Sequence, residues 1–213
     1  MKTDELVFLL AAGATPVDKN VGARRFRLAV GSGGLSAALL LVVALGVRPD
    51  IGQVVLTPTF WIKLAFPASM AAAGVVAAER LSRPGMRLGG VWAALAVPVL
   101  AVWCMGIVAF AHAEPVQRHA LIFGSTWESC PLNIAMLSIP AFMGVFWAMK
   151  GLAPTRLALA GASAGLLAGA VAAFVYAFHC PEAAAPFLGI WYVAGMAIPA
   201  LIGALLGPRL LHW

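Results

Sequence analysis

The chain has 213 residues, of which 62% are hydrophobic and only 10% are charged. An average soluble domain is about 25% charged, so this composition excludes a soluble enzyme, a nucleic-acid-binding domain and a disordered tail. The net charge of +6 then indicates membrane topology rather than direct binding of nucleic acid, because basic residues gather in the cytoplasmic loops of membrane proteins.

Residues 1–25 form a predicted N-terminal segment on the cytoplasmic side, and the remainder, 26–213, forms the membrane domain. Thr3 is a candidate N-cap, and Asp4 and Glu5 follow it in the first turn of a short apolar helix that continues through Leu6. Gly13 and Pro16 are expected to end this helix, and helices under about 12–15 residues are marginal alone in water. The helix therefore needs a surface, which is either the membrane interface or a groove on a cytoplasmic partner.

Six segments have the roughly 20 mostly apolar residues that a membrane-spanning helix needs. We place them at Phe26–Val47, Phe60–Ala78, Leu88–Ala111, Leu132–Met149, Leu157–Phe178 and Phe187–Leu206. The predicted fold is an all-α polytopic membrane protein with six transmembrane helices.

The distribution of basic residues predicts the orientation of these spans. Eleven of the 14 fall on one side: Lys2, Lys19, Arg24, Arg25, Arg27, Arg80, Arg83, Arg87, Lys150, Arg156 and Arg209. Arg48 and Arg118 fall on the other side, and Lys63 lies just inside the second span, where we expect it to snorkel to the outer interface. This bias puts both termini in the cytoplasm, with three loops facing outward.

Small residues recur at four-residue spacing in the last two spans, at Gly161, Gly165 and Gly169 and again at Gly203 and Gly207. This spacing lets two helix backbones approach closely. Packing within the chain and a face for a homo-oligomer are both open.

Ionisable side chains are nearly absent from the predicted spans, whereas ion-coupled transporters keep acids or histidines near the bilayer midplane. A small-molecule membrane transporter remains an alternative, since backbone groups also bind ligands.

Two outward loops contain a Cys-Pro step, at Cys130-Pro131 and within His179-Cys180-Pro181-Glu182. Because proline favours the first helical position, each cysteine is expected near a helix N-terminus, where the dipole favours the reactive thiolate. The pair is interpreted in three ways: a structural disulfide, a sensor that is oxidised or captures a soft metal ion with His179 as a further ligand, or simple packing. Cys104 lies mid-span and is expected to be a buried small hydrophobe.

A thiol-redox membrane enzyme is the least favoured alternative. Such enzymes exchange electrons through a closely spaced dithiol, typically Cys-x-x-Cys, and the sequence contains no such motif.

Both ends of the chain resemble the NrsF-type membrane anti-sigma factors. The resemblance rests on the opening Met1-Lys2-Thr3-Asp4-Glu5-Leu6, on His179-Cys180-Pro181-Glu182, and on the closing Arg209-Leu210-Leu211-His212-Trp213. It extends over the whole chain and its six-span layout, and the C-terminal motif is its most specific part.

The resemblance implies a regulator, not an enzyme, that binds an extracytoplasmic-function sigma factor at the bacterial inner membrane, among membrane lipids, away from RNA polymerase. It also implies that a periplasmic cysteine pair, here Cys130 and Cys180, responds to metal or oxidative stress. No permanent cofactor is expected, only a transient soft metal ion at that pair. Asp4, Glu5 and Leu6 are the residues assigned to sigma binding.

Overall fold

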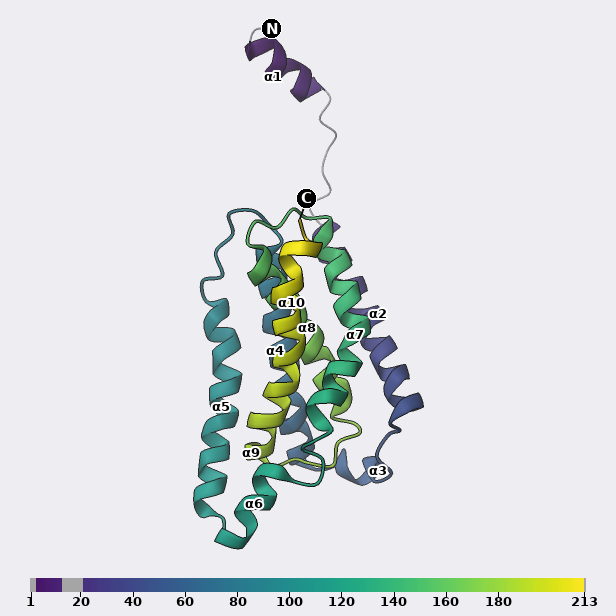
Figure 1. Ribbon diagram of the computed structural model, residues 1–213, viewed down its shortest axis with the longest axis vertical. Coiled ribbons are helices and arrows are strands. Elements are labelled where there is room, and N and C mark those ends of the chain that lie inside the picture. Colours follow the sequence, from purple (N-terminus) through teal and green to yellow (C-terminus); the bar gives the residue numbers. More distant parts are fainter. Residues whose placement is uncertain (1–2, 13–20, 213) are drawn as a thin grey trace.

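The computed structural model describes residues 3–12 and 21–212, and its main body is a bundle of long helices (Figure 1). Six helical spans are long and apolar enough to cross a membrane. They are α2 (Val21–Ala44), α4 (Pro58–Leu81), α5 (Val91–His112), α7 (Cys130–Lys150), α8 (Leu157–Tyr176) and a last span over 185–210. The described residues contain no strand. The predicted all-α fold with six membrane-spanning helices is therefore confirmed.

The last span contains three consecutive helical pieces. These are α9 (Ala185–Phe187), the π-helical turn η1 (Leu188–Tyr192) and α10 (Val193–Leu210). Single π-helical turns inside longer helices occur frequently at functional sites, and this one carries Tyr192 beside the cysteines described below.

The helix α8 is the central element of the bundle, and it packs closely on α10. A Cβ atom on Gly161 would overlap the Gly203 carbonyl, and one on Gly165 would overlap the Pro199 carbonyl. Glycine is therefore required where these two backbones touch. The small-residue faces predicted from the sequence are thus used for packing within the chain.

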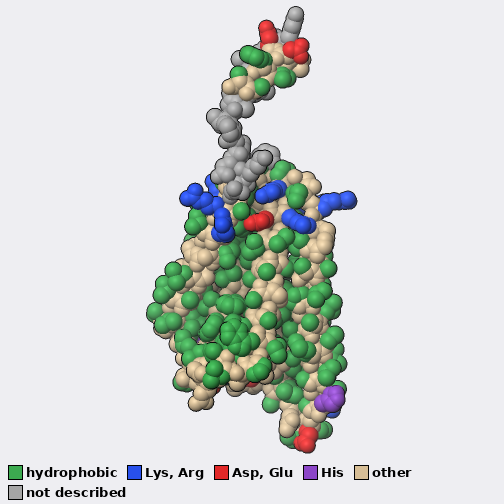
Figure 2. Space-filling view, turned by 180° about the vertical axis from the view of Figure 1, so that it is seen from behind, with side chains coloured by type: hydrophobic (Ala, Val, Ile, Leu, Met, Phe, Trp, Pro, Cys, Tyr) green, Lys and Arg blue, Asp and Glu red, His purple; other side chains and the backbone are tan. Residues whose placement is uncertain are grey.

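The two ends of the bundle differ in charge. Helix α2 begins and α10 ends at the same end, which we call the terminal end, and Lys and Arg side chains gather there (Figures 1 and 2). The short helices α3 (Ile51–Val54) and α6 (Pro115–Phe123) lie at the opposite end, together with α9. We call this the loop end, and both cysteines of the predicted pair lie there.

The helix α1 (Thr3–Ala12) stands apart from the bundle beyond its terminal end (Figure 1). It confirms the short helix predicted at the N-terminus, with Asp4 and Glu5 in its first turn. The predicted breakers Gly13 and Pro16 lie outside the described residues. Because nothing in the bundle covers this helix, Phe8 is 74% exposed.

The third cysteine departs from expectation. Cys104, predicted to be buried, is exposed on α5, which is the span with the smallest buried share. A thiol is apolar enough to face lipid, so its mid-span position in the sequence did not imply a protein core.

Candidate functional site

The thiols of Cys130 and Cys180 meet at the loop end, although 50 positions separate them in the chain. Cys130 is the first residue of α7, and Cys180 lies in the segment 177–184 that joins α8 to α9. Both residues are fully buried and both are free thiols. The two thiols lie close enough together that the Cys130 thiol is the largest influence on the pKa of Cys180. The fold thus brings together the two cysteines that the sequence singled out.

The two cysteines differ in their relation to the helices. Pro131 stands in the first turn of α7, so Cys130 occupies the predicted place at a helix start. The prediction is wrong for Cys180, because Pro181 begins no helix and α9 starts only at Ala185. The Cys180 N–H instead donates to the Tyr176 carbonyl at 3.0 Å and continues the last turn of α8. Any activation of this thiol must therefore come from its neighbours rather than from a helix N-terminus.

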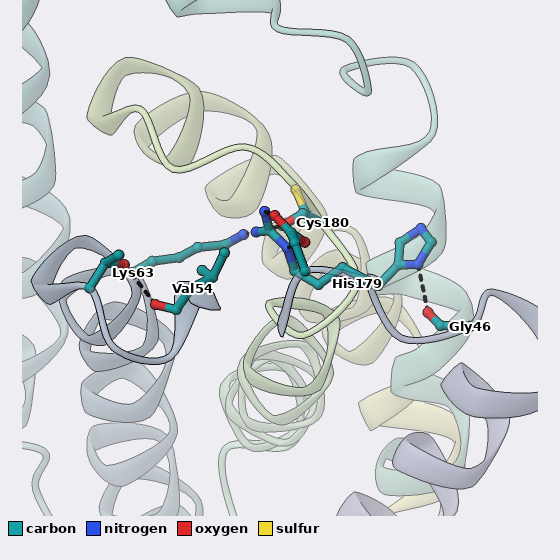
Figure 3. A network of polar contacts seen from close by, with 8 residues as sticks. Gly46, Val54, Lys63, His179 and Cys180 are labelled. Atoms are coloured by element: carbon teal, nitrogen blue, oxygen red, sulfur yellow. Dashed lines mark hydrogen bonds and ion pairs between the residues drawn. The ribbon is translucent and has the colours of Figure 1, made fainter. Parts of the chain in front are cut away.

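Two cationic side chains converge on the backbone of Cys180. Lys63 Nζ of α4 donates to the Cys180 carbonyl at 2.6 Å (Figure 3). Arg48 Nη1 donates to the same oxygen at 3.3 Å. Lys63 is 1% exposed, so the prediction that it snorkels to the interface is wrong. The carbonyl offers its ammonium a closer partner than the headgroup region does.

These neighbours lower the pKa of the Cys180 thiol below its usual range. The hydrogen bond from the Cys130 thiol is the largest cause, and the positive charge of Lys63 adds to it against the effect of burial. Because the thiolate is the nucleophile and the metal ligand, the lowered pKa makes Cys180 the more readily ionised thiol of the pair.

Two tyrosine hydroxyls add unpaired polar groups to this buried region. Tyr176 and Tyr192 are fully buried, their rings lie 6.0 Å apart, and neither hydroxyl has a well-formed hydrogen bond. The Tyr192 hydroxyl lies near the Cys180 thiol, and Lys63 Nζ is 5.7 Å from the Tyr192 ring. Buried unpaired hydroxyls are rare in proteins. Both hydroxyls here could still form a hydrogen bond close to the thiols.

The side chain of His179 points away from the thiols. Its Nδ1 lies 2.8 Å from the Gly46 carbonyl, in the turn after α2 (Figure 3). In the described part of the chain, no three His, Cys, Asp or Glu side chains come together as a metal site. Of the three residues predicted to sense a metal ion, only the two cysteines therefore lie together, and His179 contacts the turn after α2 instead.

The residues assigned to sigma binding lie far from the cysteines. Asp4, Glu5 and Leu6 are in α1, beyond the terminal end, whereas the thiols are at the loop end (Figure 1). Leu6 is 42% exposed, as are its neighbours Val7 at 59% and Phe8 at 74%. The two sets of predicted site residues therefore lie at opposite ends of the bundle.

Sequence reasoning missed the residues that surround the pair. The sequence predicts Lys63 at the membrane interface, and no pattern in it connects Arg48 or Tyr192 with the cysteines. A lone lysine in a span otherwise nearly free of charge was the available signal, because an intramembrane charge marks a function by default.

Comparison with known proteins finds relatives that are similar over the whole chain. Residues 10–213 match the family described as "Negative regulator of sigma F", NrsF. The chain is 52% identical to the probable anti-sigma-F factor NrsF of Azospira oryzae (strain ATCC BAA-33 / DSM 13638 / PS) and covers the whole of both proteins. It is 40% identical to the anti-sigma-F factor NrsF of Caulobacter vibrioides (strain NA1000 / CB15N), again over all of both chains.

Both relatives carry the names of regulators rather than of enzymes. No solved structure matches the chain significantly. The family match and the two full-length similarities place this chain in the NrsF family of negative regulators of sigma F.

Proposed function

We propose that this chain is an anti-sigma factor of the bacterial inner membrane that holds an extracytoplasmic-function sigma factor on the cytoplasmic side. It releases that partner when Cys130 and Cys180 are modified by oxidation or by a soft metal ion on the periplasmic side. The observation that carries the sensing role is the contact between two buried free thiols at the end of the bundle opposite α1.

The distribution of charge supports this orientation. Among the described residues, the basic side chains near the start of α2, at the ends of α4, α7 and α10, and just before α8 belong to the terminal end: Arg24, Arg25, Arg27, Arg80, Lys150, Arg156 and Arg209. Because lysine and arginine accumulate on the cytoplasmic side, the terminal end and α1 face the cytoplasm. The loop end then faces an oxidising compartment, in which disulfides form and persist.

The thiol pair supports two modifications. In oxidation, the two sulfurs join in a disulfide, and a peroxide takes up the two electrons and two protons and leaves as two waters or as water and an alcohol. In metal capture, both thiols lose their protons and a soft ion bridges the two thiolates. Oxidation replaces the contact between Cys130 and Cys180 with a shorter covalent bond, whereas metal capture places an ion between the two sulfurs. Either change alters the packing around them.

The helix α1 is the proposed contact with the sigma factor. Its exposed Leu6, Val7 and Phe8 suit a hydrophobic groove, which is a common way to bind a short helix, and Asp4 and Glu5 complement basic residues at the rim of such a groove. A switch from about 1% to about 99% free sigma factor would need roughly 5.5 kcal/mol of difference in binding between the two states.

Co-purification with the sigma factor tests this function. The full-length protein, expressed with its sigma factor and isolated from membranes, is expected to retain that partner and to lose it after addition of peroxide or Cd²⁺. The Cys130→Ser and Cys180→Ser variants should retain the partner under both treatments, whereas Cys104→Ser, which removes the exposed thiol, should behave like the wild type. If the wild type retains no sigma factor, the anti-sigma function fails. If the two variants still release it, the sensing role fails.

A further inference from the structure

The Cys180 carbonyl is the meeting point of three segments. Lys63 of α4 and Arg48 of the turn after α2 both donate to it, at 2.6 Å and 3.3 Å. The backbone N–H of Arg48 also donates to the Phe178 carbonyl at 3.2 Å. The ring of Phe178 packs edge-on against the ring of Phe60 of α4, with 5.6 Å between the ring centroids. The segment that carries the Cys180 thiol is therefore attached from both sides.

Lys63 differs from the other cations of the chain. Among the described residues it is the only charged side chain that is buried. Arg48, by contrast, is paired with Asp50. A buried charge is costly unless an opposite charge or polar groups compensate it. The compensation comes from the Cys180 carbonyl, from the ring of Tyr192, 5.7 Å from Nζ, and from the ionised form of the Cys180 thiol. The ammonium of Lys63 thus depends on the position of the Cys180 segment, and the segment depends on Lys63.

We propose that Lys63 is a positioning residue that holds the Cys180 segment against α7 and couples it mechanically to α4. The coupling rests on the proposed sensing function, whereas the positioning role does not. Joining the two sulfurs, directly or through a metal ion, moves the Cys180 segment relative to Cys130, and the short contact with Lys63 makes α4 follow. No other charged side chain of α4 reaches this segment in the described part of the chain.

The helix α4 is suited to carry such a shift to the terminal end. It runs continuously from Pro58 to Leu81 and so extends through the length of the bundle (Figure 1). At its far end, Arg80 Nη1 donates to the Leu88 carbonyl at 2.8 Å, which ties α4 to the loop before α5. A small displacement of α4 therefore changes the surface of the terminal end, beyond which α1 lies.

Hydrogen–deuterium exchange of the amides in 177–182 tests the positioning role without reference to the sigma factor. In detergent, Lys63→Met is expected to speed exchange of this segment by about ten-fold or more, because a hydrogen bond from a charged donor is lost and local opening becomes easier. Lys63→Arg, which keeps the cation and its donors, should stay within about three-fold of the wild type. Arg118→Met removes a charge at the same end, away from Cys180, and should leave exchange there unchanged.

Unchanged exchange in Lys63→Met overturns the proposal. Equal acceleration in the Met and Arg variants also overturns it, since that result would reflect disturbed packing rather than the lost cation. If Lys63→Met does not accumulate in the membrane, Lys63→Gln is measured in its place, with the same expectation.

Release of the sigma factor tests the coupling. Lys63→Met is expected to retain the partner and no longer to release it with peroxide or Cd²⁺, whereas Lys63→Arg and Arg118→Met respond like the wild type. Accelerated exchange with normal release would keep the positioning role and overturn the coupling through α4. If the wild type itself never responds, the proposed function fails, and the exchange measurement alone still decides the role of Lys63.

Discussion

The carboxylate of Glu182 accepts two hydrogen bonds from Ser125, one from the backbone N–H at 2.7 Å and one from the hydroxyl at 2.8 Å. Ser125 belongs to the loop that leads to Cys130, and Glu182 follows Cys180 by two positions. Gly124, directly before Ser125, has a φ of 52°, which a residue with a side chain rarely adopts, and a Cβ atom there would overlap the Glu182 carboxylate. This contact joins the two loops that carry the thiols, and it is independent of the thiols themselves.

Removal of the Glu182 carboxylate should let the two loops separate. In Glu182→Ala, we expect the rate of disulfide formation between Cys130 and Cys180 under a mild oxidant to fall by about ten-fold, because two hydrogen bonds to a charged acceptor are lost. Mass spectrometry of the oxidised protein measures this rate. Glu114→Ala is the matched control, since Glu114 precedes α6 at the same end and makes no side-chain cap bond. An unchanged rate in Glu182→Ala would show that α7 and α8 align the thiols unaided.

The reactivity of Cys180 should depend on pH in a characteristic way. The hydrogen bond from Cys130 and the charge of Lys63 lower the Cys180 pKa, so the thiolate persists at pH values below the usual cysteine pKa of about 8.5. With Cys104 replaced by alanine, alkylation of Cys180 should therefore remain fast at neutral pH and decline as the pH falls. Its midpoint, measured by mass spectrometry, should lie below that of the free amino acid.

The cause of this shift is tested by removing the donor. Cys130→Ala deletes the thiol that donates to Cys180, so the alkylation midpoint should move up toward the usual value. Cys130→Ser keeps a hydroxyl donor at nearly the same place and should raise the alkylation midpoint less. A midpoint that is the same in all three proteins would assign the shift to Lys63 rather than to Cys130.

The helices of this fold could be predicted from the sequence, whereas the chemistry around the thiols could not. Long apolar runs in the sequence are sufficient to predict the six spans. The start of α7 at Cys130 follows from Pro131 in its first turn. The same reasoning failed at Cys180, because the backbone there continues the last turn of α8 instead of starting a new helix. Proline is compatible with both conformations, so local pattern alone does not separate them.

The neighbours of the pair depend on tertiary contacts that leave no local pattern. Lys63 is 117 positions from Cys180, and its short contact there depends on how α4 lies against the end of α8. The π-helical turn that carries Tyr192 likewise has no signature in the sequence. The two cysteines themselves could be identified because their residue type restricts their chemistry, whatever the packing around them.

The exposed face of α1 should determine retention of the sigma factor. Leu6→Asp and Phe8→Asp each place a charge on an apolar, exposed position of α1 and are expected to weaken binding by at least about ten-fold, as for central apolar anchors of other interfaces. Lys substitutions at Asp4 and Glu5 should weaken it less, because charges at a rim contribute less affinity. Co-purified sigma factor, relative to membrane-bound protein, measures each effect.

Val116→Asp provides the control for these variants. Val116 is 86% exposed on α6 at the opposite end of the bundle, so the same change of residue there should not alter retention. If Leu6→Asp and Phe8→Asp also retain the partner fully, the contact must lie on the basic face of the terminal end instead of on α1.

Close packing of α8 on α10 should make Gly165 intolerant of even one methyl group. A Cβ atom there would overlap the Pro199 carbonyl and approach the backbone of Ala200, and neither can yield without moving the helix. Gly165→Ala is therefore expected to lower the free energy of unfolding by about 2 kcal/mol or more, measured by thermal unfolding in detergent. Gly31→Ala is the matched control, because a Cβ on that helical glycine of α2 meets nothing within 4 Å and alanine favours the helix by about 1 kcal/mol. Equal loss of stability in both variants would contradict a close backbone contact between α8 and α10, and stabilisation by Gly31→Ala alone would support it.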